Sequence, residues 1–434
     1  MTFFATRRQL VEEANKRLRL PIPDFALTDR KTIIDRLMQE PEILSYIEET
    51  AITENTSTDA LHRKARLYAA EIGPKFSPFF YFRLAYFLAR GWLRLHFRVQ
   101  AIAADEPGFD AIKSDSTVIF VSNHRSNFDP LLITYMASRR STVALSAGEW
   151  ARLWPLHHFV RAAGGFVVDR DASDPLYRRV LAAYVRLAVA SGLHQAFFPE
   201  GELSRDGKTG SPKLGFLNFY CRACSKNRDI VFIPAGINYD RIPEDRRLAN
   251  AEGGFANPTA SFLITTSLRY LFSVLTLPFR RRSRRYGNAC VAFGTPLSLQ
   301  DWLRQHDIDI EELEKPGRYS WLPAFADDLM RSCEQEVPAL PVAVTALALC
   351  ENRVSESWSV PELKISVDAI VQRLEVNGAN LLLPDGADAA VDFSLDLLAA
   401  NNLVRHLGDG NYSIIASERP VIRHYANSIA HLNS

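Results

Sequence analysis

Six short apolar runs alternate with helical stretches through the middle of this chain. The predicted strands are 116–121, 141–146, 164–168, 194–198, 230–236 and 289–293. The clearest helical stretch between them runs from Pro175 to Ser191. Alternation of this kind predicts an α/β fold, in which helices flank the faces of a mixed sheet.

The two ends of the chain differ from this middle part. Residues 1–75 are predicted to form a helical N-terminal region, in which Glu40–Glu42 and the polar stretch Asn55–Asp59 separate helices. Residues 76–300 are predicted to form the α/β domain, and residues 301–434 are predicted to form a mostly helical C-terminal region. Within that last region, residues 360–415 suggest a small winged-helix-like module, from which no DNA binding is inferred.

His124 and Asp129 directly follow the first predicted strand. Residues five apart do not face each other on a regular helix, so the pair must straddle the turn from the strand into the next helix. There the carboxylate accepts from one ring nitrogen and leaves the other free to take a proton from a hydroxyl. The simpler alternative is a helix cap with an acidic residue in the first turn.

Three further blocks follow in order. The second runs from Gly164 to Arg170, the third from Phe197 to Lys208 with Lys213 after it, and the fourth from Val231 to Ile242. Together, the four blocks resemble those of the glycerolipid acyltransferase superfamily. His124-Arg125-Ser126 and Tyr239-Asp240-Arg241-Ile242 are most similar to its glycerol-3-phosphate branch.

The resemblance implies a reaction. A fatty acyl thioester, carried on acyl carrier protein or coenzyme A, is attacked by the sn-1 hydroxyl of glycerol 3-phosphate, and lysophosphatidic acid for phospholipid synthesis results. His124 acts as general base and Asp129 stabilises the imidazolium. No metal and no cofactor are implied, and the thioester is a co-substrate.

The resemblance also implies a substrate site. Main-chain N–H groups at Glu200-Gly201 are expected to stabilise the thioester oxygen. Glu200 is expected either to accept from the acceptor's free hydroxyl or to hold a phosphate-binding arginine. Arg125 adds to the anion site or pairs with a surface carboxylate. The substrate-binding candidates are Arg125, Ser126, Arg170, Glu200, Gly201, Ser204, Arg205, Lys208 and Lys213.

Some positions depart from the glycerol-3-phosphate pattern. Leu203 replaces an arginine of the third block, while Asp169-Arg170 and Asn127 are more typical of enzymes that acylate lysophosphatidic acid. An sn-2 acyltransferase is therefore the first alternative. A non-catalytic lipid-binding protein of the same fold is the second.

Two segments are predicted to lie at a membrane surface. In 76–98, four arginines share one helical face with aromatic and leucine side chains on the rest: Arg83, Arg90, Arg94 and Arg98. Segment 261–285 is apolar and ends in an arginine cluster. We expect peripheral or monotopic association with the cytoplasmic face of the inner membrane. A core helix with snorkelling arginines is the alternative for the first segment.

Charge and cysteine content limit the other classes of function. The net charge of +1 argues against a general nucleic-acid binder. Five cysteines without a framework spacing fit a reducing cytoplasm, and Cys221 and Cys224 are expected in the core.

Overall fold

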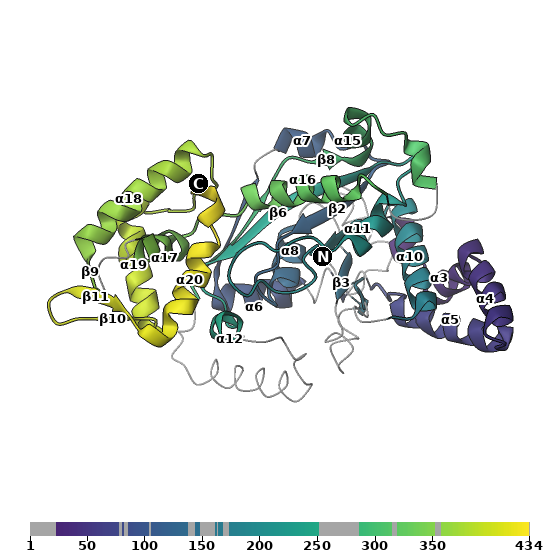
Figure 1. Ribbon diagram of the computed structural model, residues 1–434, viewed down its shortest axis with the longest axis horizontal. Helices are drawn as coiled ribbons and strands as arrows, with labels where there is room; N and C mark the ends of the chain where they lie inside the picture. The colour runs from purple at the N-terminus through teal and green to yellow at the C-terminus, as the bar shows by residue number, and fades with distance from the viewer. Residues whose placement is uncertain are drawn as a thin grey trace, which may run out of the picture.

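The computed structural model describes residues 23–77, 80–81, 86–103, 106–137, 144–147, 161–162, 164–167, 173–250, 286–314, 319–351 and 357–433. The N-terminal helices lie at one end of the molecule, the large sheet lies in the middle and the C-terminal helices lie at the other end (Figure 1). The predicted segment 261–285 and Arg170 lie outside the described residues, as does Arg83.

The N-terminal helices pack against one long helix of the α/β domain. They are α2 (Asp24–Leu27), α3 (Arg30–Leu37), α4 (Pro41–Thr53) and α5 (Thr58–Ile72), and they cover α10 (Pro175–Ala190). Asp29 caps α3 by accepting from the main-chain N–H groups of Lys31 and Thr32, which otherwise lack partners at a helix start. A helical N-terminal region was predicted, and the described part of it is helical.

The large sheet is mixed, with strand order β1-β7-β6-β2-β5-β3-β4 and β8 paired to β6. Its strands are β1 (Arg98–Ala103), β2 (Thr117–Ser122), β3 (Ala144–Ala147), β4 (Phe166–Val167), β5 (Gln195–Phe197), β6 (Ile230–Tyr239), β7 (Asn288–Phe293) and β8 (Leu297–Ser298). β2 runs parallel to both its neighbours, β5 and β6, whereas β7 and β8 run antiparallel to β6. This confirms the predicted α/β fold with a mixed sheet.

Helices cover both faces of the sheet. Val118 and Phe120 of β2 join one buried cluster, which includes residues of α6 (Tyr86–His96) and α8 (Asp129–Ala137). Ile119 and Val121 join the opposite cluster, because successive side chains of a strand point to opposite faces. The helices of that second face are α10, α11 (Leu214–Cys221), α15 (Leu299–Gln305) and α16 (Leu322–Gln335). Both α15 and α16 therefore pack on the sheet, and Cys221 and Cys224 are buried beside them.

Segment 76–98 is not one continuous helix. α6 ends at His96, and Arg98 begins β1, where its main-chain N–H donates to Gly287 O at 2.8 Å. Arg98 therefore does not share a helical face with Arg90 and Arg94, because β1 pairs with β7 from that residue on. No helix within the described ranges is long and apolar enough to span a bilayer.

The C-terminal module, residues 341–433, has its own buried cluster. It contains α17 (Pro341–Glu351), α18 (Val360–Val376), α19 (Gly386–Ala400) and α20 (Arg419–Asn427), with the short antiparallel sheet β10-β11-β9. The strands are β9 (Trp358–Ser359), β10 (Val404–His406) and β11 (Asn411–Ile414). The range 360–415, predicted as one small module, contains α18, α19, β10 and β11. The remaining short elements are α7 (Glu106–Asp110), α12 (Asp245–Ala249), η3 (Ile310–Glu314), η4 (Ala416–Glu418) and η5 (Ala430–Leu432).

Gly236 of β6 permits the chain after α16 to touch the sheet. A Cβ at this position would lie 2.2 Å from the main-chain carbon of Glu336, so Gly236→Ala should destabilise the fold by about 3 kcal/mol through overpacking. Gly215→Ala is the matched control, because nothing lies within 4 Å of a Cβ there. In the helix α11 that control should gain about 0.5–1 kcal/mol. Denaturant unfolding of both variants measures the difference, and equal stabilities would contradict the packing.

His194 links stability to pH. Its Nδ1 accepts from the main-chain N–H of Val118 at 3.1 Å, and burial lowers the pKa of the ring to about 4. The ring is therefore neutral in the fold, and its contribution is fully present above about pH 6.5 and lost as pH falls towards 4. His194→Asn keeps a hydrogen-bond acceptor but has no ring that titrates. As the pH falls from 6.5 to 4, the unfolding free energy of this variant should therefore rise relative to that of the native chain, by up to about 1.4 kcal/mol per pH unit. Urea unfolding at pH 7.5, 5.5 and 4.5 measures this, and a constant difference would refute it.

Candidate active site

The loop between β2 and α8 carries the first block and lies at the carboxyl edge of the sheet. Asn123 fixes the start of the loop to β6: its Nδ2 donates to Ile237 O at 2.9 Å, and its Oδ1 accepts from Ile237 N at 2.7 Å. α8 begins at Asp129. Because β2, β5 and β6 run parallel, the segments that follow all three strands meet at this one edge.

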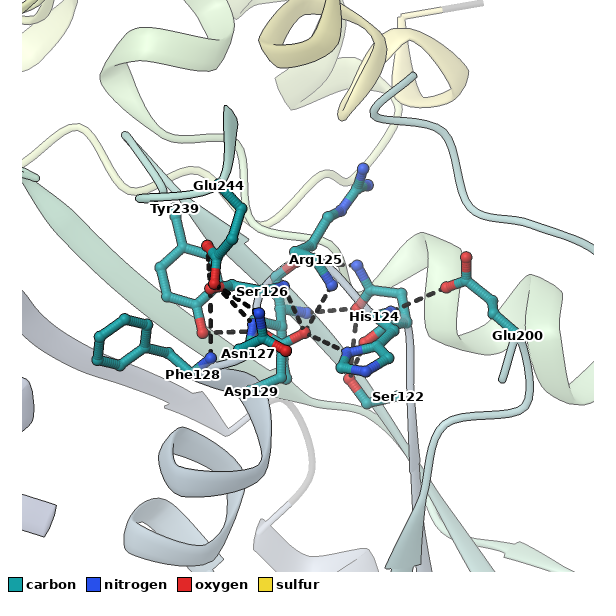
Figure 2. A network of polar contacts seen from close by, with 12 residues as sticks. Ser122, His124, Arg125, Ser126, Asn127, Phe128, Asp129, Glu200, Tyr239 and Glu244 are labelled. Atoms are coloured by element: carbon teal, nitrogen blue, oxygen red, sulfur yellow. Dashed lines mark hydrogen bonds and ion pairs between the residues drawn. The ribbon is translucent and has the colours of Figure 1, made fainter. Parts of the chain in front are cut away.

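His124 and Asp129 are in direct contact within this loop. His124 Nδ1 lies 2.8 Å from Asp129 Oδ2 (Figure 2). The carboxylate is fully buried, whereas the histidine side chain retains 10% of its exposure and stacks on the Phe198 ring at 4.2 Å. Within the described part of the chain, Nε2 has no hydrogen-bond partner. The ring is thus held from one side, and its other nitrogen is left for a ligand.

Four donors surround the Asp129 carboxylate. Besides the ring of His124, Oδ2 accepts from the main-chain N–H groups of Arg125 at 2.5 Å and Ser126 at 2.9 Å. Oδ1 accepts from the hydroxyl of Tyr239 at 2.7 Å. Burial and the neighbouring Asp129 raise the pKa of Tyr239 well above its ordinary value, so this hydroxyl remains a donor. Tyr239 belongs to the fourth block, but nothing in the sequence predicted a role for it.

Glu200 anchors the same loop from the third block. Its two carboxylate oxygens accept from the main-chain N–H groups of His124 and Gly210, each at 2.8 Å. Burial raises the pKa of Glu200, and these two N–H groups oppose that shift. Glu200 was expected to accept from the acceptor's hydroxyl or to hold a phosphate-binding arginine. Its carboxylate instead accepts from two main-chain N–H groups, and no arginine side chain donates to it within the described residues.

The Gly201 N–H is engaged inside the protein. It donates to Phe198 O at 3.0 Å, which corrects the expectation that this group stabilises a thioester oxygen. The backbone of Gly201 has φ +73°, and a Cβ there would lie 2.9 Å from the Lys213 side chain. The positive φ favours glycine in this turn, whereas the exposed Lys213 side chain could move aside.

Arg125 and Ser126 point away from the histidine ring. The Arg125 side chain extends towards the C-terminal module, where Nη2 donates to Ser428 O at 3.2 Å (Figure 2). The side chain is buried, which lowers its pKa, and its Nε and Nη1 lack partners among the described residues. Ser126 Oγ donates to Glu244 at 3.0 Å. Glu244, which had no predicted role, also accepts from the Asn127 side chain at 2.9 Å and so holds the outer part of the loop.

The remaining cations lie on the segment that follows Glu200. The loop of residues 123–128, between β2 and α8, is named the catalytic loop for the role expected of His124. The main-chain N–H of Ser204 donates to His124 O at 2.9 Å, so the segment after Glu200 touches this loop directly. Ser204 Oγ is used internally, since it donates to Lys208 O at 2.6 Å. The side chains of Arg205, Lys208 and Lys213 are exposed, and Glu202 lies 3.4 Å from Arg205 and 3.5 Å from Lys213. Blocks one, three and four therefore converge, and the described part of block two does not include Arg170.

In the part of the chain that the structure describes, no group of three histidine, cysteine or acidic side chains could hold a metal ion. The buried acid and the histidine ring are arranged for proton transfer from a hydroxyl. The exposed cations nearby suit an anionic substrate.

Comparisons with known proteins agree with this arrangement. A family model described as Acyltransferase matches residues 107–238, and one described as Glycerol-3-phosphate acyltransferase C-terminal region matches residues 271–433. A relative named glycerol-3-phosphate acyltransferase from Aeromonas hydrophila is 29% identical over 310 residues, which are 70% of this chain and 37% of that protein. Another of that name, from Alteromonas mediterranea, is 25% identical over 426 residues, 94% of this chain and 50% of that protein.

The chain thus spans about half the length, or less, of these curated relatives. A solved structure of a 1-acyl-sn-glycerophosphate acyltransferase from Thermotoga maritima covers 69% of this chain at 15% identity, with a TM-score of 0.30. At this level of similarity, the solved structure supports no conclusion about the fold or the substrate of this chain. The first family model includes β2 and the loop that follows it, and the second includes β7, β8 and the C-terminal module. Over most of its length, the chain is therefore similar to glycerol-3-phosphate acyltransferases.

Proposed function

We propose that this chain moves a fatty acyl group from an acyl thioester to the sn-1 hydroxyl of glycerol 3-phosphate. The donor is acyl carrier protein or coenzyme A thioester, and the product is lysophosphatidic acid for phospholipid synthesis. One observation carries the proposal: a buried aspartate holds one nitrogen of the partly exposed His124 ring, beside a loop that bears cations.

In this proposal, each member of the pair has its own step. His124 Nε2 takes the hydroxyl proton as the acceptor oxygen attacks the thioester carbonyl, and Asp129 stabilises the imidazolium. The tetrahedral species then collapses, the C–S bond breaks and the proton passes from Nε2 to the departing sulfur. The products are an ester and a free thiol, and no acyl-enzyme forms. Such a base contributes about 10²- to 10⁴-fold in rate.

Cations of the third block bind the acceptor's phosphate in this proposal. The segment that follows Glu200 is hydrogen-bonded to the His124 carbonyl through Ser204 N, and it carries the exposed side chains of Arg205, Lys208 and Lys213. Arg170 remains a further candidate. Arg125 and Ser126 act differently, because their side chains hold the catalytic loop to Ser428 and Glu244.

Similarity over nearly the whole chain, rather than the residues at single positions, favours the sn-1 acceptor over the sn-2 acceptor. The relatives that match 94% of the chain are named glycerol-3-phosphate acyltransferase, and the C-terminal match has the same name in its description. A non-catalytic lipid-binding function is disfavoured by the Asp129 site. A binding protein has no need to bury a carboxylate beside a histidine, and such burial is costly without partners.

Membrane association is also part of the proposal. On α6, Phe87, Arg90 and Arg94 are exposed, whereas Leu93 is buried against the sheet side. An exposed aromatic ring beside two arginines suits the headgroup region of a bilayer. We infer peripheral or monotopic association with the cytoplasmic face of the inner membrane, where a water-soluble donor and acceptor meet a lipid product.

Purified chain supplied with acyl donor and labelled glycerol 3-phosphate should form lysophosphatidic acid. His124→Ala should reduce turnover by about 10²- to 10⁴-fold, because the base is removed. Asp129→Asn should reduce it by about 10²- to 10⁴-fold, because the ring loses its carboxylate. His62→Ala, which alters a histidine of α5, is the control and should keep full activity. Product formation only with lysophosphatidic acid as acceptor would establish the sn-2 alternative, and vesicle binding without turnover the lipid-binding one.

Tyr239→Phe tests the contact between block four and the pair. Loss of the hydroxyl removes one of the four hydrogen-bond donors to Asp129. Because a hydrogen bond to a charged group contributes about 1.5 kcal/mol or more, kcat should fall by about 10-fold. Tyr412→Phe, on the half-buried strand β11 of the C-terminal module, is the matched control. Unchanged kcat in Tyr239→Phe would remove this tyrosine from the site.

A further inference from the structure

Helix α20, near the end of the chain, lies against the loop that carries the third-block cations. His424 Nδ1 donates to the Arg205 carbonyl at 2.9 Å, and Asn427 Nδ2 donates to the Asp206 carbonyl at 2.8 Å. Two side chains of one helix thus hold two consecutive carbonyls of the 204–208 loop. We propose that His424 and Asn427 are positioning residues that set the affinity for the acceptor's phosphate. This inference rests on the proposed function.

Main-chain packing brings α20 and the loop into close contact as well. Gly207 has φ +87°, and a Cβ at this position would lie 1.8 Å from the His424 carbonyl oxygen. No side chain fits between the two backbones, so the loop approaches the helix as closely as glycine allows. Burial lowers the pKa of His424 to about 4, so the ring is neutral near pH 7 and its Nδ1–H donates to the carbonyl.

The opposite side of the 204–208 loop is fixed to the catalytic loop. Ser204 N donates to His124 O at 2.9 Å, and Ser204 Oγ donates to Lys208 O at 2.6 Å. The loop is therefore held between His124 on one side and α20 on the other. Arg205 and Lys208 extend their exposed cationic side chains from this loop.

α20 is itself anchored to block four, so it can serve as a fixed support. The Tyr425 hydroxyl donates to Asp245 Oδ2 at 2.8 Å and accepts from the main-chain N–H of Ile242 at 3.1 Å. Just after the helix, Ser428 Oγ lies 3.2 Å from Asn238 Nδ2. These three contacts join α20 to the segment that follows Tyr239 and to β6 itself.

This arrangement separates acceptor binding from the chemical step. The His124–Asp129 pair is held by Tyr239, Glu200 and main-chain donors, none of which belongs to α20. Arg205 and Lys208 are instead oriented through the backbone that His424 and Asn427 hold. When that backbone is loosened, ligand binding must order it, which weakens binding without removing the base.

Steady-state kinetics on the full chain can test this separation. Asn427→Ala and His424→Leu should each raise the KM for glycerol 3-phosphate by about 3- to 10-fold, the size of one lost hydrogen bond. The kcat and the KM for the acyl donor should change by less than about 2-fold, because these substitutions leave the His124–Asp129 pair in place. His424→Asn places an amide N–H near the position of Nδ1 and should restore most of the affinity.

Asn433→Ala is the matched control. The Asn433 side chain contacts Glu351 and Arg373, both within the C-terminal module, so its loss should leave the KM unchanged. Asn427 is only half-buried, so its variant carries the test if His424→Leu fails to fold.

The outcomes distinguish the two proposals. If the native chain does not acylate glycerol 3-phosphate, the proposed function fails and this inference fails with it. If the native chain is active but Asn427→Ala matches Asn433→Ala, or loses kcat at constant KM, only the positioning role of α20 is overturned.

Discussion

A fully buried carboxylate is the constraint on which this site depends. An ionised Asp129 without partners would cost several kcal/mol, so its charge must be met by donors from the surrounding chain. Those donors come from two places: the loop that follows β2, and the end of β6, which supplies Tyr239. β6 pairs with β2 over residues 230–235 and continues, paired with β7, to Tyr239, so the sheet itself holds the tyrosine beside the acid. Fold and site are thus stabilised by the same contacts.

Much of this was predictable from local sequence. Apolar runs gave the strands because a buried strand needs apolar side chains on both faces, and β2 supplies them to two clusters. The placement of Asp129 at the start of α8 followed from its spacing to His124. Segment 76–98 was predicted to form one helix at a membrane surface. Arg98 instead begins β1 and pairs with β7, and helical periodicity alone could not reveal that pairing.

The contacts that complete the site join residues far apart in sequence. Tyr239 and Asp129 are separated by 110 positions, and His424 and Arg205 by 219. They depend on strand register and on how the C-terminal module docks, and neither leaves a short-range pattern. Glu200 shows the related difficulty that residue type does not fix a role. A carboxylate in a predicted substrate loop suggested a ligand contact, yet it accepts from two main-chain N–H groups.

Arg125 shows how charge balance redirects a residue that a motif assigns to ligand binding. Burial disfavours its cation, and the attraction of Glu200, then Asp129, Asp206 and Glu334, opposes that effect. Two of these acids flank His124, so a cation behind the catalytic loop offsets the negative charge that accumulates around the base. The guanidinium also donates to Ser428, beyond α20. Arg125 therefore lies between the catalytic loop and the C-terminal module, with its side chain directed away from the histidine ring.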